Sequence, residues 1–188
     1  MSDKNINGIL FILAGLGSLV VYMLLGETGL LSKSHTEKIA AYALLTIPLA
    51  FMVTRNVEKN AFKKVQIYID AGLLMIVVGL IMGLVSDAIN SAELSAESDL
   101  IGEAIAWTGW SIMYLGIFFT GLGYFCTNLF PNWLSGLLSL TSFVMFAYLA
   151  ILSPEQLSNS GDSIVAPLWL INSLVLVILG VFTMRRAD

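Results

Sequence analysis

Six runs of apolar residues, separated by short polar segments, dominate this sequence of 188 residues. Hydrophobic residues make up 57% of the chain and charged residues only 12%, whereas a soluble domain typically carries about 25% charged residues. Lipid offers the backbone no hydrogen-bond partner, so such runs cross a bilayer as α-helices of roughly 20 residues. The sequence therefore predicts an all-α membrane protein, a helical bundle in a single transmembrane domain (1–188), with six transmembrane helices at about 8–26, 39–54, 65–85, 101–127, 133–152 and 164–184.

The positions of lysine and arginine predict the orientation of these helices, because cytoplasmic loops are enriched in both residues. With the N-terminus inside, only Lys33 and Lys38 of the 9 cationic residues fall in outer loops. We therefore expect an N-in/C-in bundle in the cell (inner or plasma) membrane, with both termini cytoplasmic. The first run exceeds the apolar core of a signal peptide and no cleavage site follows it, so it is interpreted as a membrane helix.

Aromatic residues support the same boundaries, since their amphipathic rings favour the level of the lipid headgroups. Trp107, Trp110 and Trp169 lie toward predicted outer ends of helices. Tyr68 and Tyr124 lie toward predicted inner ends. We expect these side chains at the two membrane interfaces.

Glycine recurs at intervals of seven along the fourth run, and a shorter version of the pattern occurs in the third. On a helix this spacing makes one stripe without side-chain bulk, which lets another backbone approach closely. We interpret the stripes as helix-packing surfaces within the bundle, and a seam between copies of a homo-oligomer is the other interpretation. The packing positions are Gly102, Gly109, Gly116 and Gly123 in the fourth run and Gly72, Gly79 and Gly83 in the third.

Asp70 is the carboxylate that lies deepest inside a predicted span. An acid within a membrane is costly, and such residues commonly mark ion or proton paths. The other interpretation is an interfacial anchor that pairs with a nearby cation, namely Lys63, Lys64 or Arg55. Asp70 is thus a candidate for a transport path or pore only if it marks an ion or proton path and is not an interfacial anchor.

Asn172 and Pro48 are the two other candidates for a transport path or pore. Asn172 lies near the middle of the sixth run, and its amide either bonds to another helix or coordinates a solute; Thr141 and Ser142 lie at similar depth in the fifth run. Pro48 lies in the middle of the second run and leaves the carbonyl of Leu44 without its usual donor. We expect it to kink or loosen that helix, as in transporters with broken helices.

An inverted repeat of three helices would place the two halves of the bundle in opposite orientation. The segment Ala14–Leu19 has a faint similarity to Thr120–Phe125. Because Gly-Leu-Gly is common in glycine-rich membrane helices, this similarity does not establish a repeat.

The sequence lacks HExxH, a nucleophile elbow, a P-loop and CxxC, which are motifs of common enzymes and metal sites. The sequence has a single cysteine, Cys126, which excludes an internal disulfide and a cysteine metal cluster. It has a single histidine, His35, which excludes paired histidine ligands for haem. We therefore expect no enzyme activity, no catalytic or metal-binding residues and no cofactor. The cationic residues form no basic surface beyond the inner loops, so we expect no nucleic-acid partner either.

Two classes of function remain, and the sequence leaves them nearly level. The first is permeation, by a small transporter or an oligomeric channel for ions or small solutes, with Asp70, Asn172 and Pro48 lining or gating the path. The second is a non-catalytic accessory, assembly or effector subunit that docks on other membrane proteins. The expected partners are the lipid bilayer and either further copies of the chain or another membrane protein.

Overall fold

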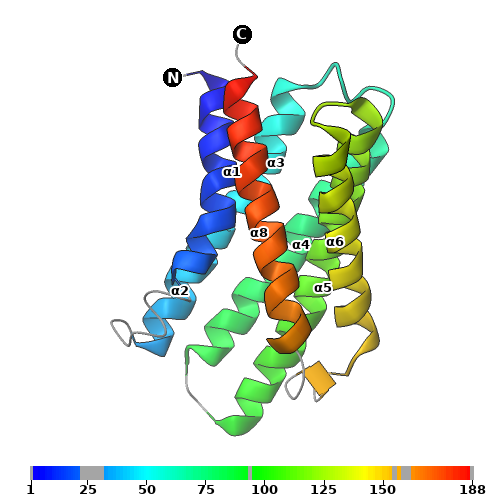
Figure 1. Ribbon diagram of the computed structural model, residues 1–188. Coiled ribbons are helices and arrows are strands. Elements are labelled where there is room, and N and C mark those ends of the chain that lie inside the picture. The colour runs from blue at the N-terminus through cyan, green and yellow to red at the C-terminus, as the bar shows by residue number, and fades with distance from the viewer. Residues whose placement is uncertain (1, 22–31, 93–94, 154–155, 158–161, 187–188) are drawn as a thin grey trace.

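The computed structural model describes residues 2–21, 32–92, 95–153, 156–157 and 162–186, and within these residues it contains helices and turns but no strand (Figure 1). The helices are α1 (Asp3–Leu19), α2 (Lys33–Leu44), α3 (Thr46–Val57), α4 (Gln66–Asn90), α5 (Ala96–Thr127), α6 (Asn132–Ile151) and α8 (Asp162–Arg185).

Several helical segments of the described chain are long and apolar enough to cross a membrane. They are Lys38–Val57, Gln66–Asn90, Ala96–Thr127, Asn132–Ile151 and Ile164–Arg185. These segments confirm the all-helical fold and agree with the second to sixth predicted spans. The first predicted span, 8–26, falls on α1, a helix of 17 residues, and its positions 22–26 lie outside the described residues.

Helices α4 and α5 both continue past the predicted apolar runs, so fewer residues separate them than predicted. A capping box begins α5: the Ser95 side chain accepts from the Ser98 backbone amide, and the Ser98 side chain accepts from the Ser95 amide. Such reciprocal bonds satisfy the free amides of a first helical turn. The turn between α5 and α6 is tighter, with Asn128 in the left-handed region at φ 52° and Pro131 capping α6. Asparagine is one of the few residues that tolerate this conformation.

Figure 1 shows an antiparallel bundle with both chain termini at one end. We call this the terminal end; it also holds the α3–α4 and α5–α6 turns. Helix α1 packs along α8, α4 packs along α5, and α5 and α1 also pack on α6 and α3, respectively.

Large apolar side chains cover the outer surface of the bundle. Ile67 is 76% exposed, Leu140 62% and Ile151 78%. Extensive apolar surface of this kind is unfavourable in water and favourable in hydrocarbon. The exposed surface and the long apolar helices together define a helical membrane protein.

Candidate functional site

The predicted packing glycines lie where α4 contacts α5, which we call the α4–α5 seam. A Cβ atom added to Gly116 would lie 2.5 Å from the carbonyl oxygen of Gly72, and one added to Gly72 would lie 2.7 Å from the carbonyl oxygen of Gly116. A Cβ on Gly109 would lie 2.8 Å from the carbonyl oxygen of Gly79. Real Cβ atoms essentially never approach within 3.0 Å, so a side chain at these positions would force the helices apart.

The remaining glycines of the two stripes differ in how closely they are packed. Gly102 faces the Asn90 side chain and Gly123 faces Ile69, so both also contact α4. A Cβ on Gly83, in contrast, would meet the Trp110 ring at 3.8 Å, an ordinary contact. Gly83 is therefore the one of the seven that has room for a methyl group.

A second seam, which the sequence analysis missed, joins α1 to α8. A Cβ on Gly180 would lie 2.5 Å from the carbonyl oxygen of Gly8, and one on Gly8 would lie 2.7 Å from that of Gly180. Further along the seam, Gly15 faces the backbone carbonyl of Ser173. The sequence feature that could have indicated this seam is the interval of seven residues between Gly8 and Gly15.

The two seams are related by one constant offset in the sequence. Residues of α1 correspond to residues of α5, and residues of α4 to residues of α8, at a separation of 101 positions. The corresponding residues are Gly8 with Gly109, Gly15 with Gly116, Gly72 with Ser173, and Gly79 with Gly180. The corresponding contacts are Gly8–Gly180 with Gly109–Gly79, and Gly15–Ser173 with Gly116–Gly72.

This correspondence has the arrangement that an inverted repeat would produce. Helices α1 and α5 run in opposite directions along the bundle, as do α4 and α8 (Figure 1). The similarity of Ala14–Leu19 to Thr120–Phe125 has a different offset and plays no part in it. Apart from the small seam residues, few residues separated by 101 positions are alike. The relation is therefore visible in the backbone contacts and not in the sequence.

Asn172 joins α8 to α6. Its side chain is 3% exposed, and its Oδ1 accepts hydrogen bonds from Thr141 Oγ1 at 3.1 Å and Ser142 Oγ at 2.9 Å. Its Nδ2 donates to the carbonyl oxygen of Leu168 at 3.0 Å. The structure thus brings together the three side chains that the sequence placed at similar depth, in the geometry expected of a bond between helices.

A small internal cavity lies beside Asn172. Its volume of about 20 Å³ has room for about one water molecule. Its wall is built by residues of α1, α2, α3, α5, α6 and α8. Most of the lining side chains are apolar; the polar and aromatic exceptions are Trp110, Tyr114, Trp169, Asn172 and Ser173.

Asp70 is not among the residues that line the cavity. Its Oδ1 accepts from Arg55 Nε at 2.5 Å, and its Oδ2 accepts from Gln66 Nε2 at 3.1 Å. The side chains of Arg55 and Asp70 are 34% and 40% exposed. Of the cations named as partners for an interfacial anchor, the structure therefore selects Arg55.

Pro48 is buried and also lies outside the cavity wall. The second span is divided at Leu45, where α2 ends and α3 begins. Proline has no amide hydrogen to donate to the Leu44 carbonyl, so a regular turn cannot close there. Thr46 Oγ1 instead donates to the Ala43 carbonyl at 2.5 Å. The expected loosening of this helix lies at Leu45.

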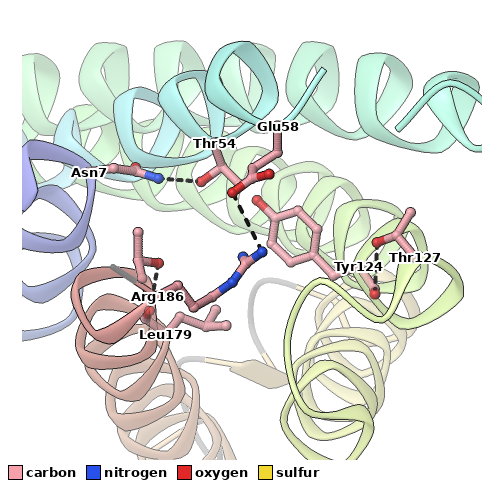
Figure 2. A network of polar contacts seen from close by, with 8 residues as sticks. Asn7, Thr54, Glu58, Tyr124, Thr127, Leu179 and Arg186 are labelled. Atoms are coloured by element: carbon pink, nitrogen blue, oxygen red, sulfur yellow. Dashed lines mark hydrogen bonds and ion pairs between the residues drawn. The ribbon is translucent and has the colours of Figure 1, made fainter. Parts of the chain in front are cut away.

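A buried polar cluster at the terminal end was not predicted. Asn7 Nδ2 donates to Thr54 Oγ1 at 2.7 Å, which joins α1 to α3. Figure 2 shows the Tyr124 hydroxyl directed toward Thr54 from α5. Among the described residues, Asn7 Oδ1 and the Tyr124 hydroxyl are buried without a hydrogen-bond partner. Tyr124 was predicted to lie at a membrane interface, but its side chain is fully buried inside the bundle.

Aromatic rings and one ion pair enclose this cluster. The Tyr124 ring has its centroid 5.7 Å from that of Phe62 and 5.1 Å from that of Phe130. The Arg186 guanidinium lies 5.5 Å from the Phe130 ring centroid and 3.5 Å from the Glu58 carboxylate (Figure 2). The terminal end is thereby closed by contacts among α3, α5 and α8.

No protein-family model matches the chain, and neither the curated proteins nor the solved structures give a significant match. The class of the protein therefore rests on its fold, that of a helical membrane protein.

Proposed function

We propose that this protein moves a small solute across a membrane by rearranging two inverted units. The first unit contains α1, α2, α3 and α4, and the second contains α5, α6 and α8. Many transporters consist of inverted repeats, and their substrates bind near the membrane midplane where the repeats meet. The observation that carries the proposal is the offset of 101 residues between the two glycine seams.

The proposal includes six membrane crossings, with α1 as the first and both termini in the cytoplasm. An even number of crossings places both termini on one side, in agreement with the bundle of Figure 1. Helix α1 packs along α8, which is long enough to span. The terminal end also carries the cationic segment with Lys59, Lys63 and Lys64, as the cytoplasmic side requires in a cell membrane.

The cavity beside Asn172 supports the proposal because residues of both units line it. Ala14 and Ile47 come from the first unit, and Tyr114, Leu138 and Asn172 from the second. A rearrangement of one unit against the other would open this space toward either side in turn.

Access to Ser173 tests the proposal without knowledge of the solute. Ser173 is 3% exposed and lines the cavity, and Ser173→Cys changes one atom. In vesicles of known orientation, with Cys126→Ser as background, a membrane-impermeant maleimide added to either side should label this cysteine slowly. Labelling from one side only, or from neither, would contradict the alternation.

Two control variants show that the reagent reaches each side. Asn60→Cys lies in the turn at the terminal end, and Ser98→Cys lies in the first turn of α5 at the other end. Each control should react from one side only, and the two sides should differ.

The second candidate function is an accessory subunit that docks on other membrane proteins. The close packing of the described interior favours it, since the cavity measures only about 20 Å³ and the Asp70 carboxylate is held by Arg55. A static bundle of this kind would leave Ser173→Cys unlabelled from both sides while both controls react.

A further inference from the structure

We infer that the cavity beside Asn172 is the solute site and that it takes a small uncharged, hydrogen-bonding molecule of a few non-hydrogen atoms. This inference rests on the proposed function and assigns its substrate class. Three properties of the cavity carry it, namely its position, the chemistry of its wall and its size.

The cavity lies beside both glycine seams. Ser173 lines it from the α1–α8 seam, where the Ser173 backbone faces Gly15. Met113 lines it from α5, and the Met113 backbone amide would lie 2.5 Å from a Cβ on Gly79 in the α4–α5 seam. A movement of either seam therefore changes the shape of this space directly.

The described residues that line the cavity include no aspartate, glutamate, lysine or arginine. Moving an ion from water into uncharged surroundings costs several kcal/mol or more unless a partner charge or enough ligands replace its hydration. The wall therefore favours an uncharged molecule over an ion.

Asn172 narrows the chemistry further. Asn172 Oδ1 accepts from the Ser142 hydroxyl at 2.9 Å and lies 3.1 Å from the Thr141 hydroxyl, whose single hydrogen is shared with the Leu137 carbonyl oxygen at 2.8 Å. Hydroxyl hydrogens therefore already face the amide oxygen, which disfavours a cation at this position. The amide nitrogen has two hydrogens, of which one is donated to the Leu168 carbonyl. Asn172 can thus offer a donor to a solute that accepts a hydrogen bond, and the Ser173 hydroxyl can offer a second donor.

The size of the cavity limits the solute. A space of about 20 Å³ admits about one water molecule before any wall movement. Met113 is an unbranched, adaptable side chain that can move away from a slightly larger guest. Urea and acetamide are small and uncharged, and both accept hydrogen bonds, so they serve as probes.

The test is uptake of radiolabelled urea and acetamide into vesicles that contain the full chain, beside rubidium and chloride tracers and protein-free vesicles. We expect saturable uptake of the neutral probes and none of the ions. Asn172→Ala and Ser173→Ala should each raise the half-saturating concentration by about five- to tenfold, as expected for one lost hydrogen bond. Thr183→Val, on the same helix and away from the cavity, should leave uptake unchanged.

The outcomes separate this inference from the proposed function. Uptake of rubidium or chloride without the neutral probes would overturn the substrate class, while two-sided labelling of Ser173→Cys would preserve the transport proposal. Two-sided labelling of Ser173→Cys without uptake of any probe would likewise overturn the substrate class and preserve the transport proposal. Neutral uptake that both Asn172→Ala and Ser173→Ala leave unchanged would overturn the site. No uptake and no labelling would overturn both proposals. Thermal unfolding shows whether Asn172→Ala and Ser173→Ala are folded. If one of them is not, uptake by the other variant decides whether the cavity is the solute site.

Discussion

The guanidinium of Arg186 lies 3.5 Å from the carboxylate of Glu58 and thereby joins the end of α8 to the end of α3 beside the buried Tyr124 ring (Figure 2). The same guanidinium lies over Phe130 in the α5–α6 turn. One side chain thus connects three parts of the terminal end.

Removal of this side chain should cost more than the ion pair alone. The Arg186 and Glu58 side chains are 35% and 25% exposed, so solvent screens the pair, and we expect it to contribute at most about 1 kcal/mol. The ring contact adds about 0.5–1 kcal/mol at such a site. In detergent, Arg186→Ala should therefore unfold at a lower temperature than Glu58→Gln. Lys59→Ala, at an exposed neighbouring position, removes the same charge and should have little effect; an equal loss there would show that only net charge matters.

The glycine seams predict a strong dependence on position for the same substitution. Gly116→Ala and Gly8→Ala place a methyl group within 3.0 Å of a facing backbone carbonyl and should cost about 1–3 kcal/mol through overpacking. Gly83→Ala has room, and the greater helix propensity of alanine should make it neutral or stabilising by up to about 1 kcal/mol.

Thermal unfolding of the three glycine variants in one detergent decides the matter. If Gly83→Ala were as damaging as Gly116→Ala, the seam would not have the close approach described here. If Gly8→Ala were harmless, the α1–α8 seam would not be equivalent to the α4–α5 seam.

The spans were predictable because transfer of apolar side chains into lipid is a local property of each run. The α4–α5 seam was also predictable, since four glycines at one interval define a helix face without knowledge of its partner. The α1–α8 seam joins Gly8 to Gly180. Helix α1 shows the glycine interval of seven once, at Gly8 and Gly15, and α8 has one glycine, Gly180, with Ser173 seven positions before it, which is too little to distinguish the pattern from chance.

The partner of Asp70 and the cluster around Tyr124 depended on the three-dimensional arrangement. Lys63, Lys64 and Arg55 all lay within reach of Asp70 by sequence position, and only the packing of α3 on α4 selects Arg55. Asn7, Thr54 and Tyr124 come from three helices, and no pattern along the chain relates them.

Asn172→Ala should weaken the contact between α6 and α8. The substitution removes an acceptor from the Thr141 and Ser142 hydroxyls, and hydrogen bonds between membrane helices contribute about 0.6–2 kcal/mol. Thr183→Val is the control: Thr183 is 6% exposed on the same helix, but its hydroxyl donates within α8, to Leu179. Chemical unfolding should show that Asn172→Ala lowers the free energy of unfolding more than Thr183→Val does. Equal losses would mean that removal of any buried polar group on α8 has this effect, and that the bonds to α6 contribute nothing specific.

Asp70→Asn should leave any flux unchanged. The carboxylate pairs with Arg55 on a partly exposed face and is absent from the cavity wall, so its removal should lower stability by only about 0–1 kcal/mol. A double-mutant cycle with Arg55→Gln, measured by thermal unfolding, should give a coupling of that size. Loss of flux in Asp70→Asn with stability preserved would restore Asp70 as part of an ion or proton path.

The orientation of the bundle remains a prediction from the distribution of cationic residues, and accessibility in intact cells tests it. With Cys126→Ser as background, Ser98→Cys should react with an impermeant maleimide added outside, whereas Asn60→Cys should react only after the cells are opened. The sequence also offers Ser158 as an outer position, but it lies outside the described residues. Ser98 begins α5 and Asn60 lies between α3 and α4 at the terminal end, so the two cysteines report opposite ends of the bundle. Reaction of Asn60→Cys alone in intact cells would invert the orientation, because it would place the terminal end, with most of the lysine and arginine residues, outside the cell.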